Sequence, residues 1–419
     1  MGGNPIHFTG IFDDPDPSVE KARFIANVLF DLIHIITMES NVHDTAHIND
    51  IRNAGDFKTV SFSNYRKIEV KRVFIDNIHK MKLEAACYWC AELICAGHFM
   101  DVWEVLLYYL GKYIHLGNPR MVIYLESRFM VFRNIIEKGN FVTELQLRNH
   151  TNVRKLFSEI VCVVTLSPRK HSYDPIRIKR EEEFNVAHMT EQLKAPSVEF
   201  AAPVFQEEDP KELYIAVNEF AYAVSKEGAC LLKACYWVEW VIEFDIMCRK
   251  RKELCRCQRR SHVQVAAKYQ KDVIWLVWDV LIHYSGLNTE FIKRIMQSLM
   301  NLFCIKYTTA CCKRRRYLLY YAVGLLADTV PTSTEIISLE HKKMLASVVE
   351  QIHKVYQQIK KNEVSPNTDY LFSNMDQSNA VENTMRKLEI MEGALPNYHR
   401  DIGGGGDAGH DDDEFLRDF

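Results

Sequence analysis

A duplicated block of sequence is the feature that most constrains the fold of this chain. Ala86-Cys87-Tyr88-Trp89 returns 148 positions later as Ala234-Cys235-Tyr236-Trp237. A second match joins Val102–Leu107 to Val277–Ile282 with an offset of 175 positions. The sequence therefore predicts two related units, and the larger second offset predicts an insertion between the matched blocks of the second unit.

Apolar residues recur at helical spacing over most of the chain. The composition of 17 Gly and 12 Pro in 419 residues, with few alternating β-rich runs, is typical of a mainly α-helical protein. The first predicted helix covers 19–38 and carries an apolar stripe of Phe24, Val28, Leu32 and Ile35. Further helices are predicted over 70–79, 83–96, 100–114, 121–136, 149–165 and 334–361, the last capped near Thr332 or Ser333.

Shifts in composition divide the chain into four parts. An N-terminal helical domain is predicted over 1–166, with the first repeat unit at about 67–136. Five prolines in 167–210 are typical of a linker between domains. A C-terminal helical domain follows over 211–361 and contains a basic, Cys-rich insertion over 245–271. Residues 362–419, with Asp411–Glu414 near the end, are predicted to be a flexible acidic tail.

The insertion is the place where the two copies differ and where we look for function. Basic residues dominate it, whereas the chain as a whole has a formal net charge of −3. One interpretation is a solvated hairpin, and the other is a contact surface for nucleic acid or an acidic partner, which Lys and Arg bind through phosphate or carboxylate. The candidate contact residues in this insertion and in a second basic run are Arg249, Lys250, Arg251, Lys252, Arg256, Arg259, Arg260, Lys313, Arg314, Arg315 and Arg316.

Thiols and an imidazole within the insertion raise the question of a metal. Cys248, Cys255, Cys257 and His262 offer four zinc ligands, and a structural zinc would explain how a short charged segment without its own core keeps one shape. Their spacing departs from that of standard zinc fingers, so the alternative is a set of ordinary thiols at a helix end. Apart from this zinc, no cofactor is predicted.

Several functional classes find no support in the sequence. The chain has no phosphate-binding loop, dinucleotide fingerprint, nucleophile elbow or kinase motif. The missing motifs favour a non-catalytic protein over an all-helical enzyme, and the sequence identifies no small-molecule substrate. No run of 18 apolar residues is present, so no membrane span is predicted. Twelve cysteines, many of them within apolar helices, and the lack of a recognisable signal peptide predict a reducing intracellular compartment, the cytoplasm or the nucleus.

The first repeat resembles a known helical region. The stretch 84–93, continuing through Gly97 to the turn at 114–119, is similar to the helical collar of clamp-loader-like AAA+ proteins. In that family an Ala-Ala-x-Tyr-Trp helix is followed by a helix that ends in a similar turn. The resemblance covers about forty residues and implies an assembly role. It implies no ATP hydrolysis, because the ATPase motifs are missing from this sequence.

The second repeat carries another resemblance. Lys233–Trp240, the basic insertion and Lys268–Asp272 are similar to poorly characterised proteins of large nucleocytoplasmic DNA viruses. This resemblance implies other viral proteins as partners and a replication site or the virion as the setting. The expected function is a helical scaffold or adaptor in viral DNA replication, expression or packaging, with DNA or RNA as a further partner. The alternative is a virion structural protein, such as a minor capsid component that bridges other subunits.

Overall fold

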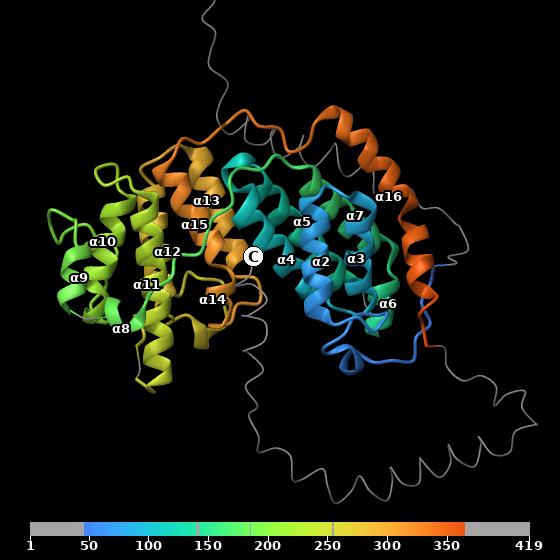
Figure 1. The fold of residues 1–419 in the computed structure, drawn as a ribbon, viewed down its shortest axis with the longest axis horizontal. Coiled ribbons are helices and arrows are strands. Elements are labelled where there is room, and N and C mark those ends of the chain that lie inside the picture. Colours follow the sequence, from blue (N-terminus) through green and yellow to red (C-terminus); the bar gives the residue numbers. More distant parts are fainter. Residues whose placement is uncertain (1–45, 140, 142, 185, 254, 365–419) are drawn as a thin grey trace, which may run out of the picture. The chain divides into compact units, whose positions relative to one another are not determined.

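Helices make up almost all of the regular structure. The computed structural model describes residues 46–364 except 140, 142, 185 and 254, and this part of the chain contains no β-strand (Figure 1). The prediction of a mainly α-helical protein is therefore confirmed. The predicted helix over 19–38 and the acidic residues Asp411–Glu414 lie outside the described residues.

The helices of the first half follow the predicted order. Their bounds are α2 (Lys67–His79), α3 (Leu83–Cys95), α4 (Phe99–Tyr109), α5 (Met121–Lys138), α6 (Glu144–Asn149) and α7 (Thr151–Leu166). A π-helical turn, η2 (Leu110–Ile114), extends α4, and a short 3-10 turn, η3 (His115–Gly117), leads towards α5. Helix α3 lies at the centre of this half, because α2, α4 and α7 all pack against it.

The second half is built from a similar series. Two short helices, α8 (Arg180–Glu183) and α9 (Val186–Gln192), precede α10 (Tyr214–Val224), α11 (Leu231–Lys250), α12 (Ile274–Ser285), α13 (Glu290–Phe303), α14 (Cys311–Arg314) and α15 (Arg316–Ala327). Helix α11 packs against α10 and α15, as α3 packs against α2 and α7. The chain then reaches α16 (Leu339–Lys360), whose N-cap is Ser338 and not the predicted Thr332 or Ser333.

The starts of the matched helices agree with the offsets of the sequence repeat. Leu83 and Leu231 open α3 and α11, and they are 148 positions apart. Phe99 and Ile274 open α4 and α12, and they are 175 positions apart. The two copies thus agree in helix order and register, while the superposition of their three-dimensional structures stays a prediction.

Matched tryptophans differ in their surroundings. Trp103 and Trp278 are each the fifth residue of their helix, are fully buried and contact phenylalanine rings of the α5 or α13 helix that follows. In the other matched pair, Trp237 is buried, whereas Trp89 is half-buried beside Tyr65. Only one member of that pair is therefore a central core residue.

The two halves pack directly against each other. Helix α5 lies against α13, and η2 lies against α15. Gly111 allows the closest approach, because a Cβ atom at this position would lie 2.7 Å from the carbonyl carbon of Tyr317. Gly111 thus has a packing function, because a larger residue here would push the halves apart.

The segment predicted as a linker packs against the helices, and its first part contacts both halves. The amide of Tyr173 donates to the carbonyl of Lys112 at 3.1 Å, and the Tyr173 ring is buried against His115 and Tyr320. All of the described residues belong to one compact unit, and this unit is not divided at 167–210. Prolines there prevent a long helix, but they do not prevent aromatic side chains from packing.

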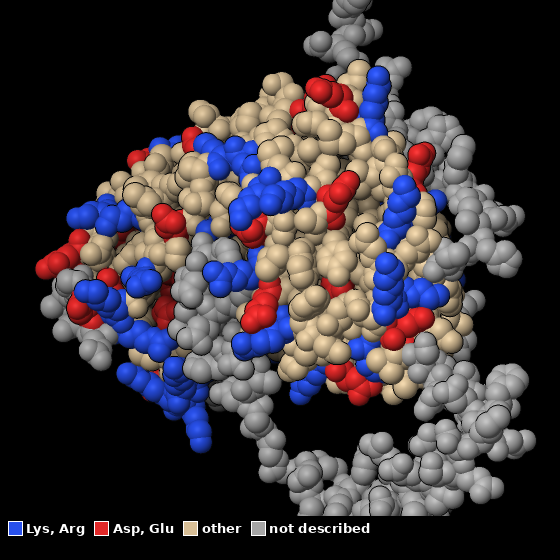
Figure 2. Space-filling view, turned by 45° about the vertical axis from the view of Figure 1, so that its right-hand side comes forward, with Lys and Arg blue, Asp and Glu red and all other residues tan. Residues whose placement is uncertain are grey.

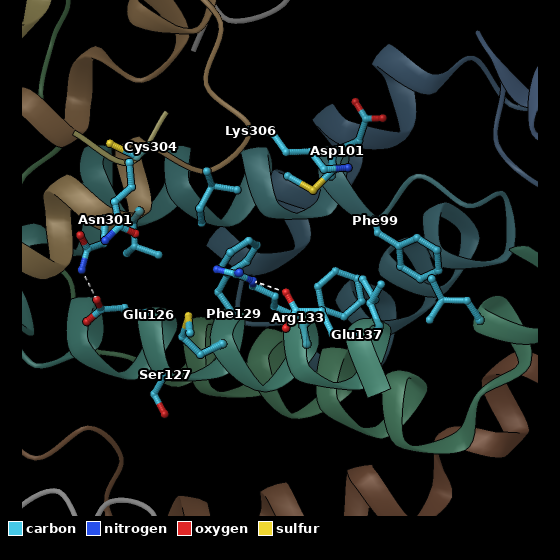
Figure 3. A pocket seen from close by; sticks show the side chains of 18 of the residues that line it. Phe99, Asp101, Glu126, Ser127, Phe129, Arg133, Glu137, Asn301, Cys304 and Lys306 are labelled. Atoms are coloured by element: carbon cyan, nitrogen blue, oxygen red, sulfur yellow. Dashed lines mark hydrogen bonds and ion pairs between the residues drawn. The ribbon is translucent and has the colours of Figure 1, made fainter. Parts of the chain in front are cut away.

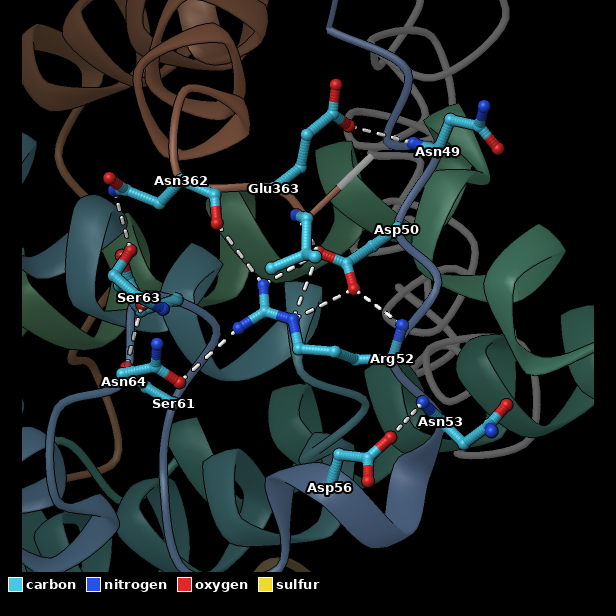
Figure 4. A network of polar contacts seen from close by, with 12 residues as sticks. Asn49, Asp50, Arg52, Asn53, Asp56, Ser61, Ser63, Asn64, Asn362 and Glu363 are labelled. Carbon is cyan, nitrogen blue, oxygen red and sulfur yellow. Dashed lines mark hydrogen bonds and ion pairs between the residues drawn. The ribbon is translucent and has the colours of Figure 1, made fainter. Parts of the chain in front are cut away.

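Helix α16 covers the first half and returns to the start of the described chain. It packs along α3 and α7. At its end, Asp50 accepts hydrogen bonds from Arg52 and from the amide of Val364, while Arg52 also donates to the carbonyl of Asn362 (Figure 4). Burial raises the pKa of Asp50, but the bonds from Arg52 and Val364 outweigh burial and lower it overall.

The paired tryptophans give a test of this packing. We expect Trp237→Ala to reduce the free energy of unfolding by about 3–5 kcal/mol, because it removes a large buried ring and leaves a cavity. Trp89→Ala should cost clearly less, because that ring already contacts solvent. Urea unfolding followed by circular dichroism measures both variants, and equal losses would contradict the assigned difference in burial.

A buried histidine at the junction of the halves predicts a pH dependence. His115 is buried, its Nε2 lies 2.6 Å from the carbonyl oxygen of His171, and burial lowers its pKa from 6.5 to about 4. The stabilising contribution of the neutral ring is complete above about pH 6.5 and is lost as the pH falls towards 4, because the unfolded chain takes up the proton first.

We therefore expect the stability difference between the wild type and His115→Gln to shrink between pH 7.5 and 4.5. Thermal unfolding of both proteins across this range measures the difference. A difference that stays constant, or grows, as the pH falls would show that His115 does not titrate as the structure requires.

Candidate nucleic-acid interface

The basic insertion begins in the last turn of α11. In Figure 1 this end of α11 extends beyond the neighbouring helices. The side chains of Arg249, Lys250, Arg251, Lys252, Arg256 and Arg259 are exposed. Six of the seven candidate cations of the insertion therefore face solvent, and Figure 2 shows Lys and Arg gathered at the lower left of the face drawn, at the level where α11 ends.

Most of these cations have no carboxylate partner in the described part of the chain. The exception is Arg249, whose Nη2 lies 2.7 Å from Oδ2 of Asp245. Burial raises the pKa of Asp245 to about 6, although Arg249 acts in the opposite direction. At neutral pH the carboxylate of Asp245 is still largely ionised, so it offsets the charge of Arg249 and leaves the cations after it to form the positive surface.

Two lysines that the sequence reasoning did not count join this surface. The amide of Cys257 donates to the carbonyl of Lys271 at 2.9 Å, and the amide of Arg260 donates to the carbonyl of Gln270 at 2.9 Å. Lys268 and Lys271 are exposed on the segment that these bonds hold beside the basic run. Their proximity depends on backbone pairing within the insertion, which no spacing rule in the sequence indicates.

Arg260 has a different position from its neighbours. Its side chain is only 1% exposed, and Nη2 lies 2.7 Å from Oδ2 of Asp209 while Nε lies 2.6 Å from Oδ2 of Asp279. Burial lowers the pKa of the guanidinium, but the bonds to both carboxylates outweigh it and raise the pKa overall. Arg260 is therefore an internal anchor, and its guanidinium does not face an external anion.

Arg260 and Gln270 keep the insertion in one shape, which is the role for which the sequence suggested a zinc ion. Arg260 also donates to Gln206 and to the carbonyl of Gln258, and the Gln270 amide donates to the carbonyl of Val263. The ion pairs and hydrogen bonds of Arg260 thus tie the insertion to the segment before α10 and to α12.

The four predicted zinc ligands do not converge. The thiols of Cys248 and Cys255 face one another, whereas Cys257 donates to the carbonyl of Asp272 at 3.3 Å. His262 lies 3.5 Å from Asp279. Over the described residues no group of three or more His, Cys, Asp or Glu side chains is placed to hold a metal ion. The arrangement of these residues therefore does not fit a tetrahedral zinc.

The second basic run does not extend the positive surface. Lys313 lies 3.0 Å from Glu243, Arg316 lies 3.2 Å from Glu239, and the buried Arg315 pairs with Glu104. Arg314 is half-buried and donates to the sulfur of Cys311 at 3.4 Å. Three of the four cations therefore join α14 and the start of α15 to α11 and α4.

The acids that hold the buried arginines follow the sequence repeat. Glu104 and Asp279 occupy matched positions, each directly after the buried tryptophan of its copy. Glu104 binds Arg315, and Asp279 binds Arg260. An acid in a nearly all-apolar helix is a sequence signal for a buried cationic partner, although it does not identify which arginine supplies the charge.

Comparisons with known proteins give no further guidance. No known family, curated protein or solved structure matches the chain. Within the described part, no helix combines the length and apolar character that crossing a bilayer requires. The candidate interface therefore stands on the geometry of the insertion, with its exposed Lys and Arg side chains held on an anchored backbone.

A pair of arginines tests the role of the anchor. Arg260→Met should reduce the free energy of unfolding by about 3–5 kcal/mol, because it leaves the carboxylates of Asp209 and Asp279 without their cation. Arg256→Met removes an exposed charge and should change stability by less than about 0.5 kcal/mol. Chemical denaturation of both variants measures this, and a mild effect of Arg260→Met would argue against a buried anchor.

Proposed function

We propose that this chain is a non-catalytic helical adaptor that contacts the phosphate backbone of DNA or RNA through its basic insertion. The contact surface consists of Lys250, Arg251, Lys252, Arg256, Arg259, Lys268 and Lys271. The observation that carries the proposal is that these exposed cations have no ion pair among the described residues, although acids elsewhere take up buried arginines.

The physical form of the surface suits a polyanion. Solvent-exposed Lys and Arg neutralise phosphates and release the counterions condensed on nucleic acid, which gives affinity without base contacts. The loop that carries them is fixed by Arg260, so the cations are presented with less conformational entropy to lose on binding. Such a surface binds with little dependence on nucleic-acid sequence.

The proposed setting comes from the resemblances in the sequence. The similarity to proteins of large DNA viruses implies a role beside other viral proteins in replication, expression or packaging. The similarity to a clamp-loader collar implies that the helical body contributes to an assembly. In this proposal, both the viral setting and the assembly role require affinity for nucleic acid.

Removing four surface charges should weaken this binding. We expect Lys250→Ser, Arg251→Ser, Lys252→Ser and Arg256→Ser together to reduce affinity for a mixed-sequence DNA or RNA duplex by at least roughly tenfold at low salt. The slope of log K against log salt concentration should become shallower by about 3, because fewer counterions are released. Fluorescence anisotropy titrations at several salt concentrations measure both quantities.

A matched control removes four exposed lysines elsewhere, Lys138, Lys343, Lys354 and Lys361. This variant changes the net charge by the same amount and should keep most of the affinity and of the salt slope. Equal losses in the two variants would assign binding to net charge alone. Unchanged affinity in the insertion variant would overturn the proposal and favour a virion structural protein. Preferential binding of polyglutamate would identify an acidic protein segment as the partner.

A further inference from the structure

A pocket with a volume of about 980 Å³ is lined by residues of α4, α5 and the end of α13. Figure 3 shows Phe129 and Arg133 of α5 on one side of the pocket, with Phe99 and Asp101 of α4 across from them. Phenylalanine and methionine side chains form much of the apolar part of the lining, namely Phe99, Met100, Phe129, Met130 and Phe132.

One edge of the pocket belongs to the basic insertion. Gln264 of the insertion lines the pocket, and so does Lys306, which follows α13. The next residue, Tyr307, donates a hydrogen bond to Asp272 at 2.9 Å. Asp272 directly follows Lys271 of the basic surface. The edge of the pocket at Lys306 is therefore joined to the backbone segment that carries this surface.

The carboxylates of the lining are each paired with a cation. The pairs are Asp101 with Lys71, Glu126 with Arg294, Glu137 with Arg133 and Glu144 with Arg148. By contrast, Lys306 is exposed and has no ion pair within the described residues. Both partners of the Arg133 pair are more than half exposed, so a phosphate can compete for Arg133, because exposed ion pairs are weak. The pocket therefore offers an anion two cations.

The aromatic wall has a surface on which a flat ring can stack. Phe129 is half-buried and packs edge-on against Trp103, with ring centroids 5.1 Å apart. Met130 beside it is 45% exposed. Arg133 follows Phe129 by one helical turn, so both side chains lie on the same side of α5. Nucleobases stack on such combinations of an aromatic ring and a guanidinium, because every base has a π-face.

The form of the site distinguishes unpaired from paired bases. In a duplex the bases are stacked and paired inside the helix, whereas a single strand can turn its bases outwards into a protein pocket. The amide of Gln264 offers both a donor and an acceptor, which suits the edges of bases. The phosphates that flank such bases can lie at Lys306 and along the basic surface of the insertion.

We propose that this pocket binds the bases of a single-stranded nucleic acid whose backbone runs over the basic insertion. Phe129 is the stacking surface, Arg133 and Lys306 contact phosphates, and Gln264 forms hydrogen bonds with base edges. This inference rests on the proposed function, because the insertion supplies most of the phosphate contacts. It adds that the preferred partner is an unpaired strand and not a duplex.

Anisotropy titrations of the full chain test this inference. The probes are a labelled single strand of mixed sequence and the duplex that it forms with its complement. The wild type should bind the single strand more tightly, by at least roughly tenfold. Phe129→Leu keeps an apolar side chain against Trp103 but removes the aromatic face. It should weaken single-strand binding by roughly tenfold and leave duplex binding unchanged.

Lys306→Ser tests the phosphate contact at an exposed position where folding does not depend on the side chain. It should make the slope of log K against log salt concentration for the single strand shallower by about 0.7, the value for one phosphate contact. The matched control is Tyr65→Leu, because Tyr65 is 47% exposed, packs edge-on against Trp89 and does not line the pocket. This control should keep both affinities.

The outcomes separate this inference from the proposed function. Single-strand affinity that falls in Phe129→Leu and Lys306→Ser but not in Tyr65→Leu supports the inference. Equal binding of single strand and duplex by the wild type overturns it, and the proposed function then stands on duplex binding. Single-strand binding that neither pocket variant weakens also overturns it and favours an apolar protein segment as the occupant. A wild type that binds neither probe overturns the proposed function as well.

Discussion

The structure depends on an ion pair that crosses between its two halves and whose arginine is buried. Arg315 at the start of α15 binds Glu104 of α4, and its guanidinium also donates to the carbonyl of Phe303 at the end of α13. One cation thus fixes three helices from both halves. Burying a guanidinium is unfavourable unless its donors are satisfied, so α4, α13 and α15 have few alternative arrangements.

Ion pairs between arginine and glutamate also join other pairs of helices. Arg128 of α5 lies 3.1 Å from Glu159 of α7, and Arg316 of α15 lies 3.2 Å from Glu239 of α11. Burial raises the pKa of both glutamates, although the arginines oppose this effect. Apolar packing supplies most of the driving force for such helices, while these polar pairs define which helix faces which.

The candidate interface and the core use the same type of residue in opposite ways. Arg260 forms ion pairs with Asp209 and Asp279, whereas Arg256 and Lys271 are exposed and available to a partner. The bonds of this anchor hold the insertion against the segment before α10 and against α12. A rigid backbone with free cations is the combination that electrostatic recognition of a polyanion requires.

The sequence by itself determined the helical class, the starts of α3 and α4 to within one residue and the presence of a basic insertion. These properties are local, because helical periodicity and charge clustering are set by residues within a few turns of one another. Only the tertiary structure decided that Arg260 and Arg315 are buried while Arg256 is exposed. The reason is that their partners Asp209, Asp279 and Glu104 are distant in sequence and become neighbours only when the helices pack. The packing of Tyr173 against His115 depends on long-range contacts in the same way.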